Sequence, residues 1–267
     1  KKNTSIFAQM KSTFRVTFLG TGTSQGIPVI GSNHPVCKSS DPKDKRLRVS
    51  VLLQWDDFTY VIDCGPDFRQ QMLRQKVSKL DGILLTHEHS DHTAGLDDIR
   101  PFNFMQGNMP FYAHKRVFKS LHERFAYIFE TENKYPGAPS VEEIEIDKDK
   151  PFTIGGKEII SIEAFHDTLP VLGFRVGDFT YLTDVKTITE EEIEKIKGTK
   201  ILVVNALREE PHYSHFNISE ALDFVEKVKP EKTYFTHISH LMGFHEEVEK
   251  KLPQNVHLAY DTLTITI

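Results

Sequence analysis

Short apolar runs that end at Gly, Asp or His alternate with polar segments along the first half of the chain. Runs of about four to eight apolar and β-branched residues between turn residues are typical of buried strands. This pattern predicts strands at residues 15–19, 49–54, 59–62 and 82–85. Residues 67–75 have the pattern of a short helix, and residues 117–129 carry an apolar stripe at helical spacing, which indicates a helix packed on a core.

The second half of the chain repeats this order of strands followed by helices. Its apolar runs predict strands at residues 152–154, 158–164, 173–176, 180–182, 201–205, 233–236 and 263–267. The dipeptides Gly-Gly at 155–156 and Gly-Asp at 177–178 are typical hairpin connections. Helices are predicted from residue 190 and over residues 219–228.

Two β-rich halves, roughly 14–130 and 151–267, predict an α/β fold with a single domain over residues 1–267. Sheets that pack face to face with helices outside form a four-layer αββα sandwich. The polar, Pro-containing stretch 131–150 interrupts the pattern, and we expect it to be a surface insertion or a lid. Residues 102–111 are expected to be a loop that shapes specificity.

Composition and charge exclude several classes of protein. The 267 residues are 39% hydrophobic and 27% charged with a net charge of −5, so no global basic field predicts a nucleic-acid partner. No apolar run approaches the roughly 20 residues that span a membrane, and two cysteines make no disulfide scaffold. Residues 1–10 are positively charged but have too short an apolar stretch for a signal peptide, so we expect a cytoplasmic protein.

Candidate metal ligands crowd into six residues, 87–92, directly after the apolar run that ends at Leu85-Thr86. His87 and His89 are two residues apart, so in an extended chain they project to the same side, and Asp91 and His92 follow toward a neighbouring position. Such a cluster would suffer repulsion or desolvation without an ion. Imidazole and carboxylate ligands suit zinc, manganese or iron better than calcium or magnesium. The motif therefore predicts a metal site.

This His-x-His-x-Asp-His motif resembles the signature of the metallo-β-lactamase-fold hydrolases, whose αββα sandwich holds two metals between its sheets. The resemblance implies that Asp184 bridges the two ions and that Asp63 braces the ligand loop from outside. The implied ligands are His87, His89 and His166 for one divalent ion, and Asp91, His92 and His237 for the other. It also implies that a hydroxide bridging the two ions is the nucleophile.

A narrower resemblance rests on the Gly-rich segment 18–28 and on residues 236–240. The segment lacks the spacing of a P-loop or a dinucleotide fingerprint. Both stretches resemble the PhnP-like phosphodiesterase branch, which implies a small, cyclic or linear phosphodiester as substrate. The branch implies a structural zinc at His34, Cys37 and His240, although Ser32 replaces one of its cysteines and is a poor zinc ligand.

The same branch implies that His215 donates a proton to the leaving group, with His212 as the alternative. His215 and the metal ligand Asp91 are the predicted catalytic residues. A lactonase or thioesterase on the same metal pair and a metal-binding module without turnover are competing hypotheses. A tRNA 3′-end nuclease would need a basic RNA-binding surface and an exosite, and neither is visible. Metal identity, zinc or manganese, stays open, as does a homodimer.

Overall fold

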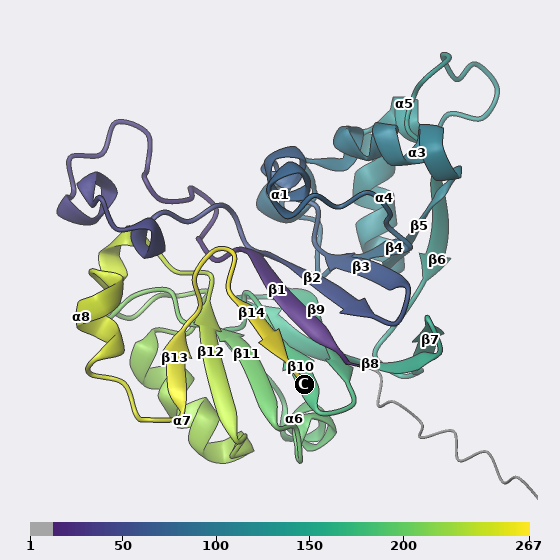
Figure 1. Ribbon diagram of the computed structural model, residues 1–267. Coiled ribbons are helices and arrows are strands. Elements are labelled where there is room, and N and C mark those ends of the chain that lie inside the picture. Colours follow the sequence, from purple (N-terminus) through teal and green to yellow (C-terminus); the bar gives the residue numbers. More distant parts are fainter. Residues whose placement is uncertain (1–12) are drawn as a thin grey trace, which may run out of the picture.

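The computed structural model describes residues 13–267, and it shows two sheets stacked against each other with helices on the outer faces (Figure 1). The stretch 1–10, on which the expectation about a signal peptide rests, lies outside the described residues. The arrangement confirms the predicted αββα sandwich. Among the described residues, no helix is long and apolar enough to cross a membrane.

The first sheet has seven strands in the order β14-β1-β2-β3-β4-β5-β6. Strands β3 to β6 are parallel to one another, so their carboxyl ends meet at one edge, whereas β14, β1 and β2 pair in antiparallel fashion. The bounds are β1 (Arg15–Gly20), β2 (Ser50–Trp55), β3 (Phe58–Ile62), β4 (Gly82–Leu84), β5 (Met109–Ala113), β6 (Val141–Glu145) and β14 (Thr264–Thr266).

The second sheet also has seven strands, in the order β13-β12-β11-β10-β9-β8-β7. Strands β10 to β13 are parallel, and β7 to β10 pair in antiparallel fashion. Gly155-Gly156 joins β7 to β8 and Gly177-Asp178 joins β9 to β10, and these are the two hairpins that the dipeptides predict. The bounds are β7 (Phe152–Ile154), β8 (Lys157–His166), β9 (Leu169–Val176), β10 (Phe179–Tyr181), β11 (Ile201–Asn205), β12 (Lys232–Thr236) and β13 (Val256–Leu258).

Helices cover the outer face of each sheet. Beside the first sheet lie α1 (Phe68–Gln75), α2 (Ser90–Thr93), α3 (Arg100–Gln106), α4 (Lys115–Arg124) and α5 (Ala126–Phe129). Beside the second sheet lie α6 (Glu190–Ile196), α7 (Ile218–Val228) and α8 (His245–Glu249). Short 3-10 helices are η1 (Pro35–Lys38), η2 (Pro42–Asp44), η3 (Leu96–Ile99) and η4 (His240–Met242).

The alternation of side chains along each strand builds three apolar layers. On β2, Leu53 points into the core between the sheets, while Leu52 packs with Phe68 of α1 on the outer face. On β11, Val203 faces the inter-sheet core and Val204 faces the helices of the second half. Because both faces of these central strands are buried, their sequences are mostly apolar and do not alternate between apolar and polar residues.

Three local predictions differ from the structure. The stretch 131–150 is not simply an insertion or lid, because β6 lies within it and forms the edge of the first sheet beside β5. Residues 102–111 are not one loop but hold most of α3 and the start of β5. The helical stripe over 117–129 belongs to two helices, since Phe125 leaves the helical region with φ −124° and ψ 39°.

Candidate metal centre

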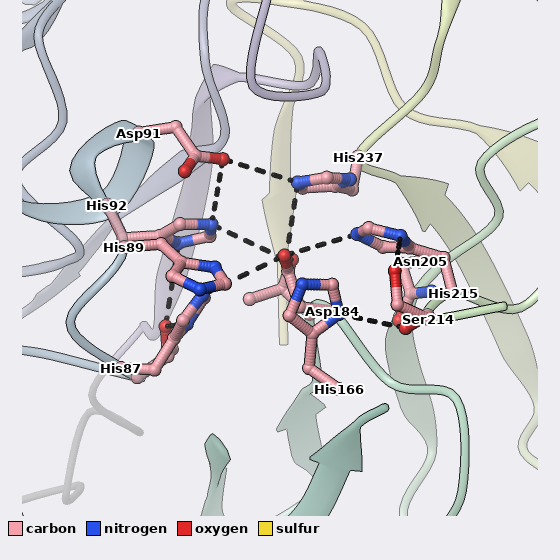
Figure 2. A network of polar contacts seen from close by, with 12 residues as sticks. His87, His89, Asp91, His92, His166, Asp184, Asn205, Ser214, His215 and His237 are labelled. Carbon is pink, nitrogen blue, oxygen red and sulfur yellow. Dashed lines mark hydrogen bonds and ion pairs between the residues drawn. The ribbon is translucent and has the colours of Figure 1, made fainter. Parts of the chain in front are cut away.

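The predicted ligands lie where strands of both sheets end. Figure 2 shows their side chains gathered around Asp184. His166 is the last residue of β8, Asp184 follows β10, and His237 comes directly after β12. The remaining four lie in the turn after β4 and in α2, and they are His87, His89, Asp91 and His92. Two distant segments of sequence therefore supply one cluster, as the resemblance implies.

The Asp184 carboxylate lies at the centre of the cluster and is 2% exposed. Its Oδ1 is 3.4 Å from Nε2 of His92 and 3.3 Å from Nε2 of His237. Its Oδ2 is 3.9 Å from Nε2 of His87 and 3.3 Å from Nε2 of His215. Each oxygen thus faces a different pair of imidazoles, which is the placement expected of a carboxylate shared by two ions.

Two separate groups of donor atoms share this carboxylate. In the first group, donor atoms of His87, His89 and Asp184 all lie within 4.8 Å of one another. In the second group the same holds for Asp91, His92, His237 and Asp184. Asp91 Oδ2 is 3.2 Å from Nε2 of His92 and 3.6 Å from Nε2 of His237.

His166 lies on the side of the first group. Its ring centroid is 5.1 Å from that of His89 and 5.9 Å from that of His87, and its donor atom lies within 4.8 Å of Asp184. The second group therefore contains the residues that the resemblance implies for one ion, whereas the first contains His87 and His89 without His166, which lies beside them. A third group joins His166 and Asp184 to His215, which was predicted to act on the leaving group rather than to hold metal.

Unpaired nitrogens test whether these residues fit metal ions. Nε2 of His87, Nε2 of His92 and both ring nitrogens of His237 are buried and make no well-aligned hydrogen bond within the described residues, although carboxylate oxygens lie 3.2–3.9 Å from the three Nε2 atoms. A buried polar atom without a partner costs about 1–3 kcal/mol. A divalent cation accepts such lone pairs, so these residues fit metal binding. Mixed histidine and aspartate ligands are typical of zinc and also suit manganese.

Hydrogen bonds behind the ligands fix the direction in which each ring points. Nδ1 of His92 donates to Asp63 Oδ2 at 2.6 Å, and Asp63 also accepts from the backbone N and the Oγ1 of Thr86, each at 2.9 Å. Nδ1 of His166 donates to the carbonyl oxygen of Ser214 at 2.8 Å. Such outer contacts select the tautomer that leaves Nε2 free for a metal. Asp63 therefore takes the bracing position that the resemblance implies.

The turn that carries Asp184 is fixed in a similar way. The Asn205 side chain at the end of β11 accepts from the backbone N of Val185 at 2.7 Å and donates to its carbonyl oxygen at 3.0 Å. This pair of bonds holds the backbone next to Asp184. The position of the shared carboxylate is thus set before any ligand binds.

The electrostatics of the cluster favour charged carboxylates. Burial raises the pKa of Asp184, but the neighbouring His237 and His92 outweigh this and hold it well below its usual range. Burial lowers the pKa of His92, yet Asp91, Asp184 and Asp63 together hold it well above its usual value. Burial lowers the pKa of His87, which stays neutral. The carboxylates of the cluster are therefore ionised, and they strongly attract positive charge, whether a proton or a metal ion.

A cavity of about 330 Å³ opens onto the cluster. His215 lies in its wall, 8% exposed, and burial lowers its pKa to about 4 while Asp184 acts in the opposite direction. His212 lies on the side of His215 that faces away from Asp184, with its Nδ1 3.2 Å from Nδ1 of His215. The structure therefore places His215, rather than His212, against the shared carboxylate. The sequence did not single out five further lining residues, which are Thr23, Ser24, Leu207, Tyr213 and Ser214.

The predicted structural zinc site is not assembled in the same way. The rings of His34 and His240 lie 5.0 Å apart, and Nδ1 of His240 is buried without a partner among the described residues. However, Nδ1 of His34 accepts from Val36 N at 3.3 Å, and Cys37 Sγ accepts from Val29 N at 3.5 Å. Within residues 13–267, the groups of donor atoms that lie within 4.8 Å of one another include none of these side chains. The structural zinc therefore stays a prediction: two of its rings lie side by side, but its donor atoms are not gathered into one group.

Residues 59–238, which carry every predicted ligand of the two ions, match the family model of the beta-lactamase superfamily domain. The chain belongs to the beta-lactamase superfamily. Its similarity to one superfamily member extends over almost its full length. A crystal structure described as a new diphosphatase from the PhnP family is 38% identical, covers 96% of this chain and 97% of its own, and superposes with a TM-score of 0.89. The chain thus lies near the PhnP branch of the superfamily and has a metallo-hydrolase fold.

Two curated relatives match smaller parts of their own length. The octanoyltransferase of Porphyromonas gingivalis is 39% identical over 95% of this chain, and the chain spans 51% of that protein. The ribonuclease Z of Methanococcus maripaludis is 32% identical over 35% of this chain and 26% of that protein. The chain therefore spans about half, or less, of the length of these curated relatives.

Proposed function

We propose that the chain is a metal-dependent phosphodiesterase that cleaves small linear or cyclic phosphodiesters to phosphomonoesters. The observation that supports this most is the Asp184 carboxylate, whose two oxygens face separate groups of buried imidazole nitrogens. Two ions held side by side suit phosphoryl transfer, because one clamp can stabilise both the attacking and the leaving oxygen. The names of two similar proteins, a diphosphatase and a ribonuclease, also denote cleavage at phosphate.

In this proposal each residue of the cluster has a defined task. Two divalent ions, zinc or manganese, would supply a nucleophile from water near neutral pH and neutralise charge on the phosphate. Asp184 would contact both ions. The other ligands would be His87, His89 and His166 for one ion, and Asp91, His92 and His237 for the other.

His215 is the proposed proton donor to the leaving group. Its Nε2 lies 3.3 Å from Asp184 Oδ2, and its ring lines the cavity in which a substrate phosphate would lie. In the reaction a water oxygen bonds to phosphorus, one ester P–O bond breaks, and the departing alkoxide takes a proton from the imidazolium form of His215. Burial lowers the pKa of His215 to about 4 in the free protein, so the proposal requires that the negative charge of a bound phosphodiester favours the imidazolium form. The proton is recovered from solvent, so the products are a phosphomonoester and an alcohol.

The cavity supports a small substrate. Its volume of about 330 Å³ is at the lower end for small-molecule sites, which range over roughly 300–1,000 Å³. Its lining, as far as the structure describes the chain, contains no Lys or Arg that would follow a polyanionic backbone. We therefore propose a small molecule, rather than a folded RNA, as the partner.

A second candidate activity is acyl hydrolysis on the same metal pair, because the Porphyromonas gingivalis relative is named for an acyl transfer. That name belongs to a protein about twice as long, so it supports this candidate less directly. One experiment separates the two. Metal content of the purified protein is measured by mass spectrometry, and the same preparation is assayed on cyclic nucleotides, aryl phosphodiesters, lactones and thioesters.

Phosphodiesterase activity predicts two ions per chain and turnover of the phosphodiesters well above that of the lactones and thioesters. Preference for a lactone or thioester would overturn the proposal in favour of acyl chemistry. Full occupancy by metal with no turnover on any ester would indicate a metal-binding module.

A further inference from the structure

Tyr213 is exposed within a stretch of chain that is otherwise buried. The three residues that follow it, Ser214, His215 and Phe216, are 3%, 8% and 8% exposed, whereas Tyr213 is 76% exposed. A single exposed aromatic side chain is ordinary on a protein surface. Tyr213 differs because it belongs to the wall of the metal cavity.

The loop that carries Tyr213 is held in place by hydrogen bonds at both ends. The backbone N of Leu207 donates to the carbonyl oxygen of Phe216 at 2.9 Å. The Arg208 guanidinium donates to the carbonyl oxygen of Pro211 at 3.0 Å. Exposure of the tyrosine is therefore a fixed feature of this loop, and little conformational entropy is lost when the ring contacts a ligand.

The same loop is linked directly to the metal cluster. The residue after Tyr213, Ser214, accepts from Nδ1 of the predicted ligand His166 at 2.8 Å. On the other side, the Tyr213 ring packs against His212 with centroids 4.6 Å apart and planes 30° from parallel. His212 also lines the cavity. The aromatic pair thus has a fixed position beside the place where a phosphate would bind.

The charges of the cavity lining indicate which kind of substituent a bound phosphodiester carries. In the described part of the chain, the charged groups of the lining are Asp91 and Asp184, and Lys or Arg is absent from it. A neutral planar ring would find an exposed aromatic surface. Base stacking on aromatic side chains tolerates any base, because every base has a π-face.

We propose that Tyr213, supported by His212, is a stacking surface for a planar ring, a nucleobase or another aryl group, on the substrate phosphodiester. The inference rests on the proposed phosphodiesterase function for the position of the phosphate. It deepens that function by naming the substrate class as a nucleoside or aryl diester. Tyr213 is in this view a specificity-determining residue and takes no part in bond cleavage.

The kinetic test compares two esters with one leaving group, thymidine 5′-(p-nitrophenyl phosphate) and ethyl p-nitrophenyl phosphate. Stacking is lost in Tyr213→Ala, so the ratio of kcat/KM between the nucleoside ester and the ethyl ester should fall about tenfold, mainly through KM. Tyr213→Phe keeps the ring and should keep the ratio. Tyr135→Ala removes an exposed tyrosine that is not part of the cavity lining, and it is the matched control. An unchanged ratio in Tyr213→Ala, or the same fall in Tyr135→Ala, would overturn the inference.

A binding experiment keeps this inference separate from the proposed function. Calorimetry measures the Kd of adenosine 5′-monophosphate and of ribose 5-phosphate for the purified protein and for each variant. We expect Tyr213→Ala to weaken the nucleotide about tenfold relative to the sugar phosphate. If the wild type hydrolyses neither ester, the proposed function fails, and the ratio of these Kd values still decides the role of Tyr213. Equal Kd ratios in wild type and Tyr213→Ala would refute it.

Discussion

Asp63 offers a test of how the chain orients its metal ligands, because it touches a predicted ligand without belonging to either group of donor atoms. Its side chain is fully buried and accepts from Nδ1 of His92 at 2.6 Å and from Thr86 N at 2.9 Å. Asp63→Asn keeps the shape of the side chain and removes its charge. The His92 ring then loses the carboxylate that selects its tautomer, and its Nε2 is no longer committed to the metal.

Two independent estimates give the size of the expected effect. A hydrogen bond to a charged group contributes about 1.5–3 kcal/mol. Loss of an outer partner of a metal ligand costs roughly 10–100-fold in metal affinity or activity, which is about 1.4–2.8 kcal/mol. The agreement predicts that Asp63→Asn weakens the ion held by Asp91, His92 and His237 by roughly 10–100-fold and affects the other ion less.

Competition between the protein and a chromophoric zinc chelator measures this affinity at fixed pH. Asp261→Asn is the matched control, because Asp261 is also a buried carboxylate and accepts from Thr21 Oγ1 and Leu47 N, both at 2.9 Å, but contacts no predicted ligand. The control should lower the melting temperature and leave zinc affinity at the wild-type value. Wild-type zinc affinity in Asp63→Asn, or an equal loss in Asp261→Asn, would refute the bracing role.

Four further predictions concern separate parts of the chain. Asp184→Ala should lose both ions, which metal analysis after dialysis would show, and retention of two ions would mean that the shared carboxylate is misassigned. His215→Ala should slow alkyl diesters at least tenfold more than activated aryl diesters, and equal losses on both would contradict proton donation to the leaving group. Cys37→Ala should leave the metal content unchanged because its Sγ belongs to no group of donor atoms among the described residues, and loss of one zinc per chain would restore the structural site. Burial lowers the pKa of His245 to about 4, and its Nδ1 accepts from the Arg46 guanidinium. The neutral side chain therefore makes its full contribution to the free energy of unfolding above about pH 6.5, the pKa in the unfolded chain, and this contribution is lost as the pH falls toward 4. Allowing for screening by water, this loss is about 2 kcal/mol, and urea unfolding of wild type and His245→Gln at pH 7 and pH 4.5 should show it as a smaller stability difference at the lower pH.

The ligands could be predicted from the sequence because strand ends and residue types coincide. His166 and His237 each close or directly follow an apolar run, and the spacing of His87 and His89 sets them on one side of the chain. These are local properties. The convergence of the candidate ligands on Asp184 depends on how the two sheets meet at their edges. The family resemblance implies this arrangement, whereas the hydrophobic periodicity does not.

Other features could not be predicted because their signals are weak or lie in three dimensions. Strand β6 is an edge strand in which three of five residues are glutamates, so its composition is that of a polar loop, although it pairs with β5 along five residues. His212 and His215 lie in one loop and are both plausible proton donors from sequence. Only the fold of the loop places His215 against Asp184 and His212 on the side of His215 that faces away from Asp184.

The backbone at the site shows why these residue types occupy these positions. Asp63, Asp184 and His237 each follow a strand, and all three have positive φ, at 65°, 58° and 55°. A side chain in this left-handed region costs of order 1–3 kcal/mol unless the surroundings impose it, and Gly, Asn, Asp and His adopt it most readily. Gly would relieve this cost but offers no ligand atom, whereas Asp and His satisfy both the turn and the cluster. Asp56, Lys76, Lys229 and Thr262 also have positive φ, so this conformation is not peculiar to the site. At the site, however, these turns bring together the shared carboxylate, the imidazole of His237 and the carboxylate that holds the ring of His92.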